Sequence, residues 1–97
     1  MDAEQQPKGQ QINIMFPERL QGGAYANNMN VLFTREEFIL DFLLAAPPVG
    51  TVTARVIVSP GHMKRILGAL TNSVQKYEAQ HGQVEPAQEP PGKIQTN

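Results

Sequence analysis

The chain has 97 residues, enough for one domain, and hydrophobic residues make up 40% of it, so a modest core is expected. Eight basic and nine acidic side chains leave a net charge of −1, which gives no strong attraction to nucleic acid or to an anionic membrane. The absence of cysteine excludes disulfides and thiolate metal sites. The polar first residues lack the apolar stretch of a secretory signal, and no apolar run is long enough to span a bilayer. We therefore expect a cytoplasmic protein.

Both ends of the chain are predicted to be disordered. Residues 1–9 are rich in Gln, Glu and Gly, and residues 83–97 form a tail rich in Pro and Gln. Neither segment can bury enough apolar surface to offset the entropy lost on ordering. The foldable part is one domain over residues 10–82.

Two strands are predicted in the first part of this domain. In residues 10–17, Ile12, Ile14 and Phe16 recur with a period of two, and Pro17 ends the pattern. A turn-rich connection follows. Residues 23–33 then place Tyr25, Asn27, Met29, Val31 and Phe33 on one face, as a second strand would.

Residues 36–46 fit either a strand or a helix. Phe38, Leu40, Phe42 and Leu44 alternate as in a strand, whereas Thr34 three residues before Glu37 could form the capping box of a helix. The β-type residues before and after this segment favour the strand.

The last two elements have clearer patterns. Residues 51–59 are rich in β-branched side chains, which predicts a fourth strand. A long helix then follows, with Ser59 as N-cap, Pro60 at its first position and Gly82 just past its end. Apolar residues recur every three to four positions and form one side of this helix. They are Met63, Ile66, Leu67, Leu70, Val74 and Tyr77.

The predicted fold is α+β: a four-stranded antiparallel β-meander followed by one long C-terminal α-helix packed on the sheet. A core of this size is marginal by itself. One helix covers one face of a sheet, yet Ile39 and Leu43 face away from Phe38, Leu40 and Phe42. We therefore expect a homo-oligomer, and a two-fold dimer in particular.

The stretch SPGHMKR, residues 59–65, is a candidate anion site. A helix start has unpaired N–H groups, and Ser59, His62, Lys64 and Arg65 add donors and positive charge. Ordinary helix capping, with Lys64 and Arg65 facing solvent, explains the same residues and is the favoured interpretation.

Two other groups of residues are candidates. Asp41 lies within an apolar run, and Arg55 on the following strand is a natural partner for a structural ion pair across a hairpin. Tyr25, Asn27 and Asn28 could form a polar recognition face, or simply an irregular strand edge. The sequence contains no recognisable catalytic grouping and no cofactor motif. No metal site is expected either, because His62 and His81 lie too far apart on one helix to bind the same metal within a chain.

Five short motifs occur in order from Ile12 to Gly82: INIMFPE, YAN, EFILDF, RVIVSP and YEAQHG. In this order they resemble a small bacterial and archaeal family catalogued only as a domain of unknown function. The resemblance implies a stand-alone module, and it carries no established activity and no catalytic residues. The order of strands and helix also resembles that of export chaperones that assemble as dimers of dimers, although the residues do not match.

The expected function is that of a non-enzymatic, homo-oligomeric protein-binding or adaptor module, with a chaperone-like role within this class. Its binding residues would be exposed ones near the sheet and the helix start. The alternative is the binding of nucleic acid or another anion at Ser59–Arg65, although the core has no basic stripe with interleaved aromatics.

Overall fold

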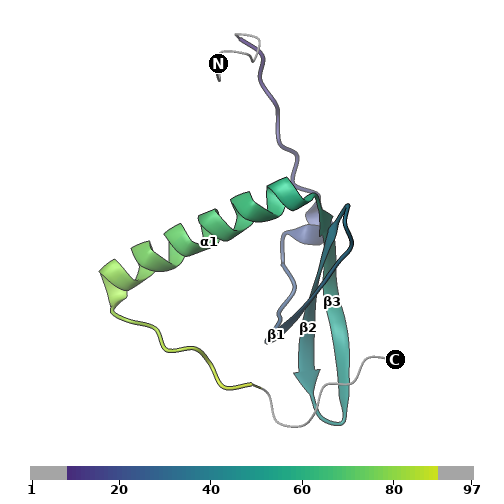
Figure 1. Cartoon of the computed structure of the whole chain (residues 1–97), viewed down its shortest axis with the longest axis vertical. Helices are drawn as coiled ribbons and strands as arrows, with labels where there is room; N and C mark the ends of the chain where they lie inside the picture. Colours follow the sequence, from purple (N-terminus) through teal and green to yellow (C-terminus); the bar gives the residue numbers. More distant parts are fainter. Residues whose placement is uncertain (1–8, 90–97) are drawn as a thin grey trace.

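The computed structural model describes residues 9–89 and contains an antiparallel sheet followed by one long helix (Figure 1). In the described residues the sheet has three strands, in the order β1-β2-β3, so that β2 is central. A short 3₁₀ helix precedes the sheet. The elements in chain order are η2 (Glu18–Leu20), β1 (Asn28–Phe33), β2 (Phe38–Ala46), β3 (Val49–Val58) and α1 (Pro60–His81).

The segment that fitted either a strand or a helix is a strand, β2. The hydroxyl oxygen of Thr34 accepts the N–H of Glu36 at 3.1 Å and the N–H of Glu37 at 3.2 Å. The N–H of Thr34 also donates to the carbonyl of Glu37. The Thr34 hydroxyl thus closes the turn between β1 and β2 with the same kind of hydrogen bonds that would cap a helix. A Thr side chain can accept nearby backbone N–H groups in a turn as well as at a helix start.

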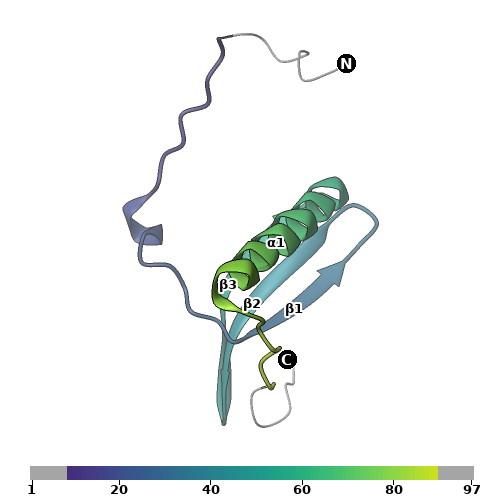
Figure 2. The same ribbon diagram turned by 90° about the vertical axis from the view of Figure 1, so that its left-hand side faces the viewer.

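The prediction of a strand at residues 10–17, which would make the sheet four-stranded, is wrong for the single chain. These residues form no regular element, and Ile12 and Ile14 are 87% and 84% exposed. Figures 1 and 2 show the segment running away from the sheet. Residues that alternate with a period of two form a strand only when they pair with the edge of a sheet. In its own chain this segment pairs with no sheet edge.

The two faces of the sheet differ in chemistry. Residues directly opposite in the register lie on the same face, so Val31, Leu40 and Val56 form one cross-strand row. This face, which we call the apolar face, consists of Met29, Val31, Phe33, Phe38, Leu40, Phe42, Leu44, Ala54, Val56 and Val58. The opposite face contains Asp41 and Arg55 among apolar side chains.

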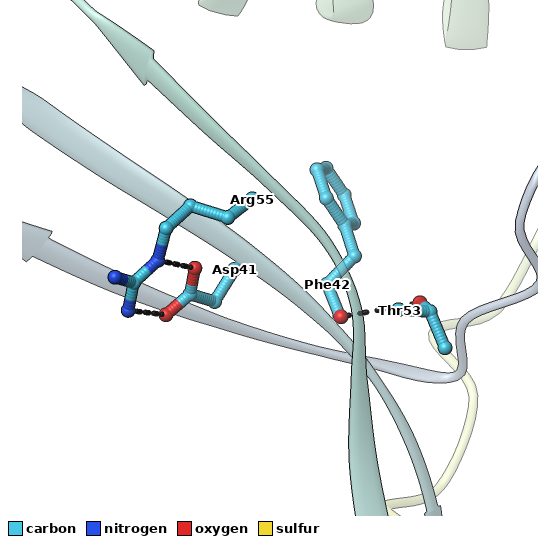
Figure 3. A network of polar contacts seen from close by, with 4 residues as sticks. All are labelled: Asp41, Phe42, Thr53 and Arg55. Atoms are coloured by element: carbon cyan, nitrogen blue, oxygen red, sulfur yellow. Dashed lines mark hydrogen bonds and ion pairs between the residues drawn. The ribbon is translucent and has the colours of Figure 1, made fainter. Parts of the chain in front are cut away.

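A bulge interrupts the pairing of β2 with β3. Phe42 lies opposite Ala54 and Leu43 opposite Val52, so Thr53 is the extra residue. The hydroxyl of Thr53 donates to the carbonyl of Phe42 at 3.2 Å (Figure 3). The side chain of the extra residue thus supplies a hydrogen bond at the bulge. A bulge of this kind bends its strand and increases its local twist.

The helix begins and ends as predicted. The hydroxyl oxygen of Ser59 accepts the N–H of His62 at 3.1 Å, and Pro60 is the first helical residue. Gly82 follows the last turn with a φ of 94°, a conformation that favours glycine, and its N–H donates to the carbonyl of Glu78. The 22 residues make a helix about 33 Å long.

The prediction that the helix packs along the sheet is not what the structure shows. α1 leaves the end of β3 at an angle (Figure 1), and no residue of α1 is buried. Met63 and Ile66, near the junction, are half-buried, whereas Leu70 is 58% exposed. Only Ser59 separates β3 from the helix, so the direction of the helix is set at this short junction.

The core of the described chain is very small. Its buried hydrophobic residues are Leu40 and Ala45, and the buried charged residue is Asp41. Cross-strand contacts such as the Phe33 and Phe38 rings, 5.6 Å apart, add to it at the surface. The predicted domain boundary at residue 82 stays a prediction, and the predicted disorder of residues 1–8 and 90–97 lies outside the described residues.

Candidate functional site

Two large apolar surfaces of the described chain remain uncovered. One is the apolar face of the sheet, where Met29, Val31 and Val56 are 42%, 40% and 47% exposed. The other is the apolar side of α1, which we call the helix stripe and which consists of Met63, Ile66, Leu67, Leu70, Val74 and Tyr77. The last four of these residues are between 51% and 58% exposed. Exposed apolar surfaces of this kind are common at interaction sites of proteins.

The Asp41–Arg55 ion pair is present as predicted. Arg55 Nε lies 2.7 Å from Asp41 Oδ1, and Arg55 Nη2 lies 2.8 Å from Oδ2 (Figure 3). This bidentate hydrogen bonding, together with the positive charge of Arg55, lowers the pKa of Asp41; the desolvation of the carboxyl opposes it. The same hydrogen bonds raise the pKa of Arg55. A carboxylate held ionised and paired on both oxygens is structural in character, which is the role expected for it.

Phe42 and the ion pair project to opposite sides of the sheet (Figure 3). This follows from the alternation of side chains along β2, in which Asp41 and Phe42 are neighbours. The ion pair therefore occupies one face and leaves the apolar face free of charge.

Asn27 has a structural role that the sequence interpretation missed. Its side-chain nitrogen donates to the carbonyl of Ala45 at 3.0 Å, and its side-chain oxygen accepts the N–H of Ala45 at 2.8 Å. The amide thus imitates one more residue of strand pairing beyond the start of β1. An Asn before a strand indicates irregular backbone, but only the register reveals the partner of its side chain.

An open hollow lies beside this Asn27–Ala45 contact, at the turn between β2 and β3. It brings together Tyr25 and Asn27 of the predicted recognition face, and Tyr25 is 77% exposed. Asn28 does not line it; its side-chain oxygen accepts the N–H of Met29 at 2.7 Å. The chain after α1 also contributes, through residues that no sequence pattern singled out. The lining residues are Tyr25, Ala26, Asn27, Ala45, Ala46, Pro47, Ala87 and Gln88.

The helix start is separate from this hollow. The register places Val58, the residue before Ser59, at one end of the sheet and the Ala46–Val49 turn at the other. His62, Lys64 and Arg65 are exposed. The Ser59 hydroxyl already accepts the N–H of His62, so one of the amides that an anion would use is taken. The predicted residues thus form two groups at opposite ends of the sheet.

The described residues hold no group of three or more His, Cys, Asp or Glu side chains suited to a metal ion. Within the same residues, no helix has the length and apolar character needed to cross a membrane.

Comparison with known proteins places the chain in a family. Residues 1–86 match the family described as "Protein of unknown function (DUF3467)", and the chain belongs to this family. No curated protein and no solved structure matches the chain. Membership in an uncharacterised family is as predicted, whereas the five motifs and the range of organisms stay predictions.

Proposed function

We propose that this member of the DUF3467 family is a non-enzymatic, homo-oligomeric protein-binding module of the cytoplasm. The observation that carries the proposal is the exposure of both the apolar face and the helix stripe, while buried hydrophobic residues in residues 9–89 are limited to Leu40 and Ala45. A chain with so little burial lacks the free energy to offset its ordering entropy. A second copy supplies the missing burial.

The helix stripe and the apolar face are suited to each other. The stripe residues carry no charge, and the ion pair lies on the opposite face of the sheet. The lengths also agree, since the helix is about 33 Å long and the 10 residues of β3 extend over about 33 Å. The stripe of one copy can therefore lie along the sheet of another, with the exchange made twice about a two-fold axis.

The area that this contact would bury is large enough for a dimer interface. Fully burying one aliphatic side chain removes on the order of 100 Å² of apolar surface from water. The exposed members of the apolar face and the helix stripe have between 39% and 72% of their surface accessible. Two such contacts in a symmetric dimer bury roughly 1,000 Å² in total, which is about the smallest area expected of a biological interface.

The protein-binding surface that remains in such an oligomer is the hollow beside Tyr25. Tyr25 offers an apolar ring with a hydroxyl at its tip, a combination common at protein interfaces. The hollow lies at the end of the sheet away from the helix start, so a partner can occupy it without displacing the helix stripe from its contact.

The oligomer is tested by light scattering on the full chain and two matched variants. Leu70→Glu puts a charge on the helix stripe, and Thr71→Glu puts the same charge on a neighbouring exposed residue off the stripe. We expect the wild type and Thr71→Glu to have at least twice the mass of one chain, and Leu70→Glu to lose this mass. A monomeric wild type would refute the proposal.

Protein binding is tested by affinity capture of tagged protein from the lysate of its host, with half of the sample treated with nuclease. We expect one enriched protein that survives nuclease and that Tyr25→Ser no longer retains. Enrichment that disappears entirely with nuclease would contradict the proposal and point to the helix start as an anion site, with Lys64 and Arg65 as the first residues to change.

A further inference from the structure

Residues 10–16, with the sequence QQINIMF, have the pattern of a strand but pair with no strand of their own chain. Ile12, Ile14 and Phe16 alternate with other residues, as on one side of a strand, and are 87%, 84% and 65% exposed. The segment contains no charge and no proline. Such an apolar segment pairs readily with any open strand edge that it meets.

The two edges of the sheet are not equally open to pairing. β3 carries Arg55 and the bulge at Thr53, which are features that discourage edge pairing. β1 has the sequence NMNVLF, with no charge and no proline, and its register with β2 is unbroken. The edge of β1 is therefore a regular, uncharged template for a further strand.

The segment and this edge are kept apart within one chain. The turn-rich connection through η2 and Gly23, which has a φ of 74°, lies between residues 10–16 and β1. Both views show the segment leading away from the sheet (Figures 1 and 2). An acceptor edge of the same kind is present on every other copy of the chain.

We infer that residues 10–16 of one copy add as a fourth strand to β1 of a second copy, with the exchange reciprocal about a two-fold axis. The inference rests on the proposed homo-oligomer and names the segment that joins its copies. β1 has 6 residues, and the segment at residues 10–16 is one residue longer, so it can pair along the whole of β1. In this pairing Ile12, Ile14 and Phe16 extend the apolar face beyond Met29, Val31 and Phe33, and the four-stranded sheet that the sequence predicts forms between chains.

The absence of native cysteine allows a direct cross-linking test. One chain carries Ile14→Cys, and a second chain with a distinguishable tag carries Val31→Cys on β1. The matched control carries Val56→Cys on β3, because Val31 and Val56 flank Leu40 in one cross-strand row and are 40% and 47% exposed. The tagged chains are mixed as oligomers, allowed to exchange, and treated with a short bis-maleimide.

We expect a mixed cross-linked dimer from the Ile14→Cys and Val31→Cys chains, several-fold more abundant than from the Ile14→Cys and Val56→Cys chains. Equal yields, or a preference for Val56→Cys, would overturn the assignment to β1. A chain carrying both Ile14→Cys and Val31→Cys that cross-links only within itself would overturn the exchange. Light scattering on each cysteine chain first confirms the wild-type mass.

The result separates this inference from the proposed function. If the wild type is an oligomer but the mixed cross-link is absent, the exchange of residues 10–16 is wrong and the homo-oligomer stands. If the wild type is monomeric, both are wrong.

Discussion

Asp41 and Arg55 lie directly opposite each other on β2 and β3, and the guanidinium of Arg55 binds both oxygens of the Asp41 carboxylate. The carboxylate is buried, with only 5% of Asp41 exposed, whereas the Arg55 side chain is 56% exposed. Arg55 therefore covers the carboxylate from solvent while its own charge stays hydrated. The pair allows one charged residue to occupy the central strand.

This pair predicts how stability depends on pH. The pKa of Asp41 in the folded chain lies below its ordinary value of 3.8, so the pair stabilises the fold above that value and is lost as the pH falls through the lowered pKa. We expect Asp41→Asn to lower Tm by a few degrees at neutral pH, and this difference to shrink in acid below about pH 4. Thermal unfolding across pH measures it.

The control for this prediction is Glu36→Gln, which removes an exposed carboxylate in the turn between β1 and β2. We expect its Tm to follow the wild type at every pH. A difference between wild type and Asp41→Asn that stays constant into strong acid would show that charge on Asp41 is not what stabilises the fold.

Asn27→Ala is expected to destabilise the chain by about 1–3 kcal/mol, because it leaves the backbone N–H and C=O of buried Ala45 without their partners. Denaturant unfolding at fixed protein concentration measures this free energy. Asn30→Ala, at an exposed position of β1, is the matched control and should change stability much less. Equal effects of the two changes would mean that the Asn27 amide contributes nothing specific.

Ser59→Ala is expected to cost about 0.5–2 kcal/mol, since the N–H of His62 loses its acceptor at the helix start. Ser73→Ala makes the same chemical change at an exposed position inside α1 and should be neutral or slightly stabilising. Circular dichroism during denaturation compares the two variants. If Ser59→Ala is as stable as Ser73→Ala, the Ser59 hydroxyl does not contribute to the stability of the helix start.

Several features were predictable because they depend on residues close together in the chain. Ser59, Pro60 and Gly82 mark the ends of α1, and capping and backbone preference act within a few residues. The ion pair was predictable for a related reason. Once β2 and β3 are joined by a short turn, Asp41 and Arg55 become cross-strand neighbours.

Other features depended on contacts that local patterns do not specify. The alternation at Ile12, Ile14 and Phe16 indicates the capacity to form a strand, but not which edge receives it. The tail residues Ala87 and Gln88 line the hollow beside Tyr25 only because the chain returns to the sheet after α1.

The sequence by itself determined the alternation of apolar residues in the strands, the helix and its ends, and the small size of the possible core. These follow from periodicity, capping and chain length, all of which are local or global properties of the sequence. Only the tertiary structure decided that residues 10–17 stay out of the sheet and that α1 leaves the sheet with its stripe exposed. The first outcome depends on the connection through η2 and Gly23, and the second depends on the one-residue junction at Ser59. A hydrophobic pattern indicates that a surface is to be covered without indicating what covers it.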